Sequence, residues 1–426
     1  MLNKRQVIVV GSGPAGASAA FYLATNGVDV LMVDKETWPR DKVCGDSQAQ
    51  NFVSKVYKDM GIYEEVQKVC GYGIRKAFYG GVKEDPAMFD FGGDLSNSFL
   101  LQRRIIDDML RRGAMRVGAD FLENFEVTEV IRERGFAKGI RGIYGGKLVE
   151  LRADAVILAN GSHNNLGKPF GIMHLDPELV YIAARGYFRN VRGAEPGCFE
   201  EHLVFPEMYP SGYFWSFLLR DDIANVGVFI SEKSLIKSNC RLEDYITRWR
   251  DTTRIGGERL GESELIGEIK GWRLTTSREV RDDIYGNGIL AVGDAGGHIN
   301  CHSGGGFEFA LQSGYAAGMT LPDLLKKGDV SREALRAFYE LDAQLINPFM
   351  KINTAVHDKV SCDPEIYERF IAFAKEMPDY PNFDQYTAYC MFMMVEQDVD
   401  LTEECGIDLV AMNQQQANYE QLPSKL

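Results

Sequence analysis

The first 34 residues contain the feature that most restricts how this chain can fold. A short apolar, β-branched run from Gln6 to Val10 predicts a buried strand. Glycines at positions 11, 13 and 16 follow in G-x-G-x-x-G spacing, and the alanine-rich stretch 15–26 predicts a helix that Gly27 ends. A second apolar run, 28–33, predicts another strand, and Asp34 follows it. This order of elements is typical of a Rossmann βαβ unit.

Each part of this unit serves to hold a dinucleotide. Gly11 permits the tight turn, Gly13 lets backbone N–H groups approach a pyrophosphate, and Gly16 lets the helix pack closely on the strand. Asp34, 23 residues after Gly11, can accept hydrogen bonds from ribose hydroxyls. The position at the start of the chain favours FAD as a resident cofactor, although NAD would fit the same residues. The predicted contacts are Gly11, Gly13, Pro14, Ala15, Gly16, Asp34 and Lys35.

Composition is that of a soluble globular protein. Hydrophobic residues make up 45% and charged residues 25% of 426 residues, a length that suits two or three domains. No apolar run approaches the roughly 18 residues of a membrane-spanning helix, and the first strand begins too early to leave room for a signal peptide. We therefore expect a cytoplasmic protein.

Charge and cysteine spacing argue against other function classes. The net charge of −14 disfavours nucleic acid as a partner and disfavours binding to anionic lipid through a basic patch. The 8 cysteines and 6 histidines show neither C-x-x-C nor H-E-x-x-H spacing, so no metal site or disulfide framework is indicated. Residues 363–426 hold 13 acidic and 3 basic side chains, which predicts a solvated outer layer or an acidic docking face.

Two later apolar runs predict strands that end at the same dinucleotide. The run 153–161 is typical of a parallel strand buried on both faces, and the run 289–294 is typical of another. Three consecutive glycines then lead into a predicted helix, 307–325, whose N-terminus offers N–H groups and a positive dipole end to an isoalloxazine ring. The predicted cofactor contacts here are Gly161, Gly293, Asp294, Gly304, Gly305 and Gly306.

The stretch 166–280 alternates in polarity and is rich in aromatic residues, which predicts an inserted antiparallel sheet. Tyr213, Trp215 and Phe217 alternate along one strand and therefore point to one face. Taken alone, they read more readily as sheet core than as an aromatic wall beside an apolar substrate.

Two further candidates lie outside the glycine motifs. Cys44 and Gly45 belong to a loop, WPRDKVCGD, in which a buried and inert cysteine is the common case and a thiol near the flavin is the alternative. Arg103 lies near the start of a predicted helix over 100–114, where it could reach a phosphate or an adenosine hydroxyl, or lie on a solvated face.

The predicted fold is α/β, with a Rossmann-type FAD-binding domain, an inserted antiparallel-sheet substrate domain and a C-terminal helical region. The FAD-binding domain takes residues 1–165, with the segment 46–100 toward the substrate side, and resumes over 281–330. The substrate domain takes 166–280 and the helical region 331–426, of which we expect 411–426 to be frayed.

The motifs together resemble group A flavoproteins of the p-hydroxybenzoate hydroxylase fold and are most similar to the geranylgeranyl reductase family. The matching pieces are GSGPAG with Asp34, PRDKVCGD, Arg103 with Asp107, ILANGS, YPSGYFWSF and GDAGGHINCHSGGG, within residues 6 to about 318. The Pro-Arg-x-Lys-x-Cys-Gly segment and the Tyr-x-Trp-x-Phe strand are the pieces that point to the reductases.

The resemblance implies FAD, hydride transfer from flavin N5 and saturation of isoprenoid C=C bonds. It also implies that Cys44 lies near the flavin and that the aromatic strand lines a tunnel for the prenyl chain. The chain departs from the family where Leu218 follows the aromatic strand in place of proline, and where Cys301 and Gly305 replace the proline and glutamate of the last loop. We hypothesise that Cys301 and Cys44 form a redox pair or supply a proton. The candidate catalytic residues are Cys44, Tyr213, Trp215, Cys301 and His302.

Several alternatives stay open at this point. A flavin monooxygenase or halogenase could use the same scaffold, although Phe214-Trp215-Ser216-Phe217 does not match the Trp-x-Trp-x-Ile-Pro segment of halogenases. A dehydrogenase of specialised metabolism and a flavoprotein that binds lipid without turnover are further alternatives. With one Rossmann fingerprint, electrons must come from transiently bound NAD(P)H or from a ferredoxin-like carrier. An apolar substrate would favour peripheral membrane contact, although no basic amphipathic helix indicates it.

Overall fold

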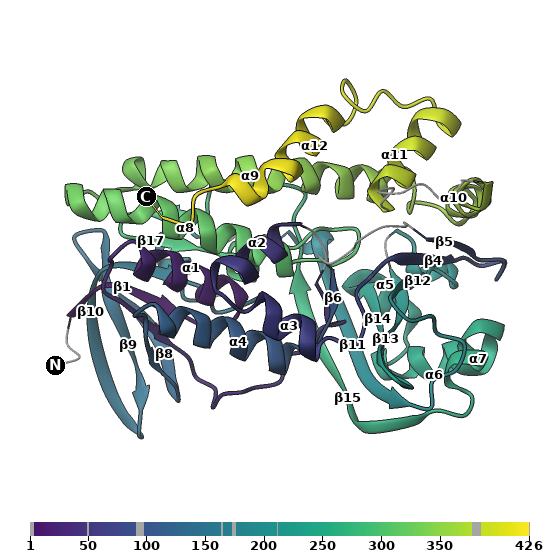
Figure 1. Ribbon diagram of the computed structural model, residues 1–426, viewed down its shortest axis with the longest axis horizontal. Coiled ribbons are helices and arrows are strands. Elements are labelled where there is room, and N and C mark those ends of the chain that lie inside the picture. The colour runs from purple at the N-terminus through teal and green to yellow at the C-terminus, as the bar shows by residue number, and fades with distance from the viewer. Residues whose placement is uncertain are drawn as a thin grey trace.

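The computed structural model describes residues 4–48, 51–90, 98–162, 165–172, 176–210, 212–376 and 385–425. Two sheets lie side by side along the long axis of the molecule, and two long helices, α8 (Phe307–Lys327) and α9 (Arg332–Lys359), run above them (Figure 1). The mixed α/β fold that the sequence predicts is therefore confirmed.

The first sheet is built around the predicted βαβ unit. Among the described residues its strands follow the order β16-β17-β10-β1-β2-β7, and β8 and β9 extend it from β10. The five central strands pair in parallel. Their runs 7–10, 30–33, 156–158 and 289–291 are buried on both faces, which explains why these stretches are continuously apolar. The strands are β1 (Lys4–Val10), β2 (Val30–Val33), β7 (Asp120–Leu122), β8 (Phe125–Glu133), β9 (Phe136–Tyr144), β10 (Lys147–Leu158), β16 (Tyr285–Gly286) and β17 (Ile289–Ala291).

The second sheet follows the order β15-β11-β14-β13-β12-β4-β5 within the described residues. It is antiparallel except where β12 pairs with β4, so it combines the predicted inserted strands with two strands from earlier in the chain. A separate two-stranded sheet is formed by β3 (Ser47–Gln48) and β6 (Phe99–Leu100), which come just before β4 and just after β5 in the chain. The strands are β4 (Lys76–Gly80), β5 (Ala87–Asp90), β11 (Val180–Arg189), β12 (Cys198–His202), β13 (Tyr213–Arg220), β14 (Ile223–Ser231) and β15 (Glu264–Thr275).

Alternation along the second sheet separates two cores. Tyr213, Trp215 and Phe217 belong to the large core that also contains α1 and α8, and this confirms that they share one face of β13. Their neighbours Phe214 and Leu218 face a smaller core with Trp249. The face that carries the aromatic triplet is therefore the one turned toward the Rossmann unit.

Helices cover both sheets. α1 (Pro14–Thr25) lies between α4 (Arg103–Arg116) and α8, and α9 packs on α8. α5 (Glu232–Ser238), α6 (Leu242–Thr252) and α7 (Arg254–Leu260) belong to the second sheet, and the C-terminal helices rise above it at the upper right of Figure 1. The remaining helices are α2 (Asn51–Asp59), α3 (Tyr63–Val69), α10 (Pro364–Glu376), α11 (Gln385–Glu396) and α12 (Leu409–Asn418).

Some local predictions were wrong. The sequence from Gln48 to Val69 has a helical pattern and predicts one helix, but the structure has two, α2 and α3, because Gly61 with φ +65° ends the first; residues 49–50 lie outside the described residues. The helix expected over 100–114 begins at Arg103, since Leu100 pairs in β6. The C-terminal stretch expected to be frayed forms α12, and the hydroxyl of the buried Tyr419 accepts a hydrogen bond from Gln312.

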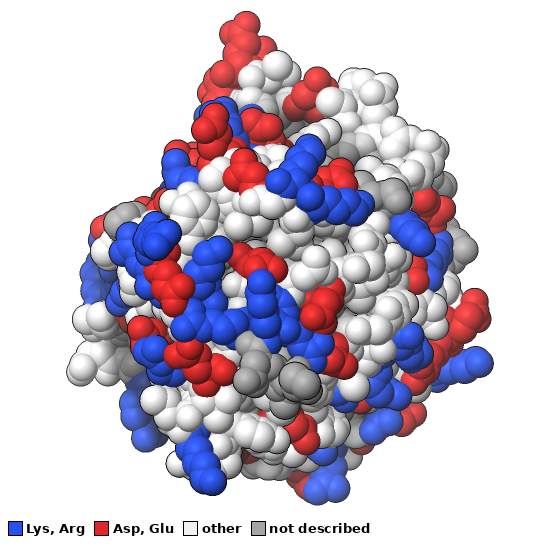
Figure 2. All heavy atoms as spheres, turned by 90° about the vertical axis from the view of Figure 1, so that its left-hand side faces the viewer, with Lys and Arg blue, Asp and Glu red and all other residues white. Residues whose placement is uncertain are grey.

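The surface at the left-hand side of Figure 1 mixes charges of both signs (Figure 2). On strands β8 to β10, Arg141 pairs with Glu129 and Glu150, and Arg152 pairs with Glu133 and Glu150. Among the described helices, none combines the length and the apolar composition that crossing a bilayer requires.

Candidate active site

The glycine turn after β1 has a backbone path that only glycine can follow. Gly11 has φ +99°, and a Cβ there would lie 2.3 Å from the carbonyl oxygen of Ala159 on β10. A Cβ on Gly16 would lie 2.0 Å from the carbonyl oxygen of Gly11. The turn therefore brings the N-terminus of α1 against the ends of β1 and β10, as a pyrophosphate-binding turn requires.

The N-terminus of α1 is open to an anion. Within the described chain, no side chain caps this helix and no acidic residue lies in its first turn. A Cβ on Gly13 would lie 3.3 Å from Nη2 of Arg40, so this guanidinium faces the turn. Backbone N–H groups, a positive dipole end and a cation together attract a phosphate. Sequence reasoning did not single out Arg40, although it belongs to the Cys44 loop.

Arg103 lies beside Arg40 in a buried ion cluster. Its Nε and Nη2 atoms donate to the two oxygens of Asp107 at 2.7 and 2.9 Å, and Nη1 of Arg40 lies 2.8 Å from the same carboxylate. Burial opposes both charges, but their attraction outweighs it, so the pKa of Asp107 is lowered and the pKa of Arg103 is raised. Arg103 is 8% exposed, which excludes a solvated face.

The Asp34 carboxylate is fixed in position and can accept one further hydrogen bond. Its carboxylate accepts bonds from N and Oγ of Ser12, at 2.9 and 2.7 Å, and from N of Glu36 at 3.0 Å. A carboxylate has about four acceptor positions, so one is left for a ribose hydroxyl. The next residue, Lys35, is exposed and lies 3.9 Å from Glu36.

The ends of β10 and β17 complete the same edge of the sheet. Gly161 and Gly293 both have positive φ, +79° and +59°, and a Cβ on Gly293 would lie 2.8 Å from Cβ of Ala15 in α1. Asp294 accepts a hydrogen bond from Ser162 at 3.1 Å. The side-chain oxygen of Asn160 is buried and has no hydrogen-bond partner among the described residues. This edge therefore still has polar groups to offer a ligand.

The loop before α8 is closed on itself by Asn300. Its Oδ1 accepts from N of His302 and of Ser303, at 3.1 and 2.7 Å. A Cβ on Gly304 would lie 2.7 Å from the Phe229 ring, so the loop packs directly on the second sheet. Gly305 donates from its N to Ser303, and Gly306 begins α8 without a side-chain cap among the described residues.

These features fit FAD on structural grounds. The glycine turn, the uncapped N-termini of α1 and α8, the cation at the turn and the unpaired oxygen of Asn160 all lie at the carboxyl edge of the first sheet. The predicted cofactor residues that the structure brings to this edge are Gly11, Gly13, Pro14, Ala15, Gly16, Asp34, Gly161, Gly293, Asp294, Gly304, Gly305 and Gly306.

The Cys44 loop is clamped to the second sheet through Asp46. This buried carboxylate accepts hydrogen bonds from the Tyr187 hydroxyl at 2.7 Å, from Nδ2 of Asn225 at 2.9 Å and from N of Arg103 at 3.0 Å. Burial nevertheless raises the pKa of Asp46 to about 6. Sequence reasoning missed Asp46 and Asn225, because their contacts join segments about 180 residues apart in sequence.

Asn225 also connects Cys44 to the aromatic strand. Its Nδ2 donates to the Cys44 carbonyl at 2.7 Å, and its Oδ1 accepts from Nε1 of Trp215 at 2.8 Å. A Cβ on Gly45 would lie 3.0 Å from the Phe217 ring. Arg103 interacts electrostatically with Cys44. The predicted site residues Cys44, Gly45, Arg103 and Trp215 are therefore brought together.

Tyr213 lies in the same group. Its hydroxyl donates to the carbonyl of Ser303 at 2.7 Å, which joins β13 to the loop before α8, and it interacts electrostatically with Cys44. Burial raises the pKa of Tyr213 well above its ordinary value. Its ring lies 5.7 Å from Phe229, which stacks on Tyr181 at 4.5 Å.

Cys301 and His302 face other neighbours. Sγ of Cys301 lies 3.9 Å from Oγ1 of Thr354 on α9, and burial raises the pKa of this thiol to about 11. Burial and then His357 lower the pKa of His302 to about 3. The rings of Tyr181, Phe229 and Tyr213 form a row, with Phe229 in the middle. Cys301 interacts electrostatically with Tyr181 at one end of this row, and Cys44 interacts with Tyr213 at the other end. The redox pairing of the two thiols stays a prediction.

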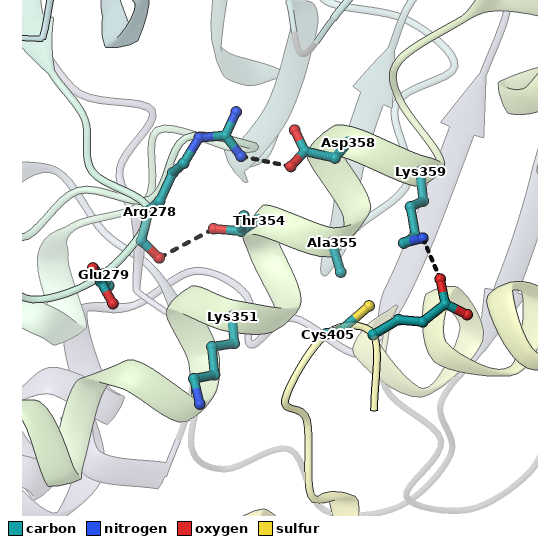
Figure 3. Close-up of a pocket in the computed structure, with 9 residues that line it drawn as sticks. Arg278, Glu279, Lys351, Thr354, Ala355, Asp358, Lys359 and Cys405 are labelled. Carbon is teal, nitrogen blue, oxygen red and sulfur yellow. Dashed lines mark hydrogen bonds and ion pairs between the residues drawn. The ribbon is translucent and has the colours of Figure 1, made fainter. Parts of the chain in front are cut away.

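A surface cavity of about 260 Å³ lies on the Thr354 side (Figure 3). Arg278 pairs with Asp358 at 2.6 Å and Lys359 with Glu404 at 2.9 Å, and Thr354 donates to the carbonyl of Arg278. A lining of paired charges does not suit an apolar chain, so we do not place the substrate here.

Comparison with known proteins supports this geometry. Residues 4–184 match the FAD binding domain family model. The chain is 29% identical to the digeranylgeranylglycerophospholipid reductase of Methanosarcina acetivorans, with 78% of this chain and 79% of that protein covered. It is 27% identical to the menaquinone reductase of Mycolicibacterium smegmatis, with 78% of each covered.

Solved structures share the whole fold. The geranylgeranyl bacteriochlorophyll reductase-like protein of Thermoplasma acidophilum has a TM-score of 0.83 at 22% identity and covers 94% of this chain and 98% of its own. A flavin-dependent brominase has a TM-score of 0.74 at 18% identity, with 92% and 99% covered. The chain is an FAD-dependent oxidoreductase. Within that class its sequence is similar to the two reductases named above, and its fold is that of the geranylgeranyl bacteriochlorophyll reductase-like protein.

Proposed function

We propose that this flavoprotein reduces C=C bonds of an isoprenoid or other apolar substrate. The observation that carries the proposal is the clamp at Asn225, which bonds both the Cys44 carbonyl and Trp215. It joins the loop that the resemblance places near the flavin to the strand that the resemblance places beside the prenyl chain. A substrate on this aromatic face would lie next to the cofactor-binding loops.

The residues around this face suit an apolar substrate. Tyr213, Trp215 and Phe217 are each less than a tenth exposed and share their face with Phe229. Aromatic side chains bind apolar chains through large contact areas that exclude water. Bound FAD, once reduced, would supply a hydride equivalent. The protein must then hold the alkene in register and deliver a proton, because an isolated alkene is a poor electrophile.

The cofactor-binding and catalytic residues remain part of this proposal. Arg40 and Arg103 would balance the pyrophosphate charge together with the N-terminus of α1, and Asp34 would accept from a ribose hydroxyl. Cys44, Tyr213 and Trp215 would contact the reacting region. Cys301 and His302 belong to the loop that precedes α8 and would act on the side of that loop that faces α9.

The test is anaerobic. The holoenzyme is reduced with dithionite and mixed without oxygen with a digeranylgeranylglycerophospholipid or with a prenylated menaquinone. We expect the flavin to re-oxidise and the product mass to rise by two hydrogens. Flavin that re-oxidises without formation of a saturated product would contradict the proposal. The electrons would then have gone to the quinone head group and not to a C=C bond.

The same experiment distinguishes the rival chemistry on this fold. The brominase likeness shows the fold alone, and Phe214-Trp215-Ser216-Phe217 does not carry the halogenase segment. Reduced flavin that stays reduced with both probes and reacts only when oxygen is admitted would favour a monooxygenase. Comparing NAD(P)H with a reduced ferredoxin as electron source in the same cuvette would identify the redox partner.

A further inference from the structure

Glu201 is a buried carboxyl on the aromatic face. It lies on β12, is 1% exposed, and pairs in register with Trp215 on β13 and with Tyr79 on β4. Register partners project to the same side of a sheet, so Glu201 shares the face of the aromatic triplet. Its neighbour Glu200 points to the opposite face, where Nε of Arg259 donates to it at 2.9 Å.

In the part of the chain that the structure describes, the surroundings of Glu201 contain tyrosine hydroxyls and no partner of opposite charge. Among the described residues its one hydrogen bond comes from the Tyr367 hydroxyl at 3.3 Å, and no cation pairs with it. The titratable groups that face it come from β4, from the segment before β13, from β13, α10 and α11, and are Tyr79, Tyr209, Tyr213, Tyr367 and Tyr389.

This environment keeps a proton on Glu201. Burial raises its pKa to about 8, against a smaller lowering by the Tyr367 hydrogen bond. The ionised carboxylate would be a buried charge without compensation, and the neutral acid avoids that cost. At neutral pH Glu201 is therefore a carboxylic acid that can give a proton.

Glu201 belongs to the same cluster as Cys44. The Tyr213 phenol interacts electrostatically with both of them, and its hydroxyl bonds the loop before α8. The other candidate donors are poorer acids or are differently placed. The Cys301 thiol, with a pKa of about 11, releases a proton less readily, and His302, with a pKa of about 3, is already neutral at physiological pH.

We infer that Glu201 is the proton donor for the substrate C=C bond. The inference rests on the proposed function. In the reaction the π bond breaks and two C–H bonds form, one with a hydride equivalent from the reduced cofactor and one with the proton of the Glu201 carboxyl. The carboxylate that remains takes a proton from solvent after the product leaves. The tyrosines around it would lower the cost of the transient charge by donating hydrogen bonds.

The test compares the wild type with E201Q, which keeps the shape of the side chain and removes the acidic proton. Reduced holoenzyme is mixed anaerobically with a digeranylgeranylglycerophospholipid across a pH series. General acids contribute about 100-fold or more to such rates, so we expect E201Q to slow flavin re-oxidation by about that factor. The wild-type rate should fall above the pKa of about 8, and the E201Q rate should not.

Two further measurements separate catalysis from structure. In the infrared difference spectrum of the two FAD-loaded proteins at neutral pH, the wild type should show a C=O band of a protonated carboxyl that E201Q lacks; Glu308, whose pKa burial also raises, contributes its own band to both proteins and cancels. E200Q is the matched control, because it changes an equally buried carboxyl on the other face, and it should keep the alkaline fall in rate. Y367F, which removes the hydrogen bond to Glu201, should shift that fall to higher pH.

The outcomes are distinguishable. If neither prenyl probe re-oxidises the wild-type flavin, the proposed function fails and the donor role fails with it, whatever the infrared band shows. If the wild type saturates the probe and E201Q keeps its rate and pH profile, only the role of Glu201 is overturned. A difference spectrum in which E201Q loses no protonated-carboxyl band relative to the wild type would also overturn it.

Discussion

Buried charges at the cofactor edge depend on single partners. Asp107 is fully buried and is shared by Arg103 and Arg40, whose side chains are 10% and 15% exposed. A guanidinium that loses its carboxylate inside a protein cannot regain its hydration. This arrangement makes Asp107 a residue on which both the stability of the fold and the binding of FAD depend.

We predict that D107N lowers the free energy of unfolding by about 3–5 kcal/mol, because removing one partner leaves buried charge uncompensated. FAD affinity should fall as well, since Arg103 and Arg40 lose their orientation. Urea unfolding and flavin retention on gel filtration measure the two effects. D108N is the control, because Asp108 pairs with Arg111 and Arg112 on a more exposed face and should cost about 1 kcal/mol or less. Equal losses in the two variants would contradict the prediction.

Between elements, the contact of α1 with α8 decides where the two helix N-termini lie. A Cβ on Gly314 would lie 2.4 Å from the carbonyl oxygen of Ala15, and one on Gly318 would lie 2.4 Å from Cβ of Tyr22. These glycines let the helices touch along their backbones. The N-termini of α1 and α8 are therefore held in one arrangement, which both ends of the dinucleotide need.

We predict that G318L pushes α8 away from α1 and destabilises the protein by about 1–3 kcal/mol or more, the usual cost of overpacking. The preparation should also lose FAD, because the loop that ends at Gly306 moves with α8. Thermal unfolding and the absorbance of bound flavin measure this. G328N is the matched control on the same helix: Gly328 has φ +68° with open space around it, and asparagine tolerates that conformation. Retention of normal flavin content by G318L would contradict the prediction.

Over the whole molecule, buried ionisable groups give stability a dependence on pH. The folded-state pKa values of Asp46 and Glu201 are raised to about 6 and about 8, so each carboxyl favours the folded state fully below its unfolded pKa and loses that contribution as pH rises through the folded value. His298 acts in the same direction. Burial lowers its pKa, but Asp342 at 2.6 Å outweighs burial and raises it.

Carboxylates whose pKa is lowered in the folded state change the stability in the opposite direction, at acidic pH. The pKa of Asp358 is lowered to about 2, since its bonds to His357 and Arg278 outweigh burial, and the pKa of Asp107 is lowered by its arginines. Such carboxylates contribute stability above the unfolded pKa and lose it as pH falls through the folded value.

We therefore predict a free energy of unfolding that is highest near pH 5 and falls toward pH 8, measured by urea unfolding across a pH series. Each proton difference contributes up to about 1.4 kcal/mol per pH unit. In E201Q the fall between about pH 4.5 and 8 should be smaller than in the wild type, because the glutamine does not ionise. Stability that rises steadily from pH 5 to pH 8 in the wild type would contradict the prediction.

A second whole-molecule prediction concerns His298, which ties the loop after β17 to α9. Its ring nitrogens bond the Gly293 carbonyl at 2.9 Å and the Asp342 carboxylate at 2.6 Å. We predict that H298A lowers stability at pH 6 by more than at pH 9, because the wild-type contribution is lost as pH rises through the raised pKa. Comparing urea midpoints of both proteins at the two pH values tests this. A loss that is the same at both would contradict it.

The sequence by itself determined the βαβ unit, the FAD class and the helical character of the chain after residue 331, with the exception of α12. These depend on spacing within short stretches, such as Gly11 to Gly16 or the apolar run before Asp34, and local backbone sterics and periodicity act over the same range. The motifs of the Cys44 loop and the Tyr213 strand were sufficient to suggest the family. The residues alone did not decide whether Arg103 is solvated or buried, or whether Cys44 is an inert core residue or part of the site. The sequence around a single polar side chain does not indicate which distant residue it contacts.

Only the tertiary structure decided which distant side chains meet. The register of β12 against β13 places Glu201 beside Trp215, and a one-residue shift would have turned it to the face of Glu200. A Cβ on Gly227 would lie 2.1 Å from the Trp215 ring, so β14 makes room for that side chain. Asn225 can join Cys44 to Trp215 only after both sheets have packed. Contacts of this kind depend on strand pairing and packing between segments far apart in the chain, which no local pattern encodes.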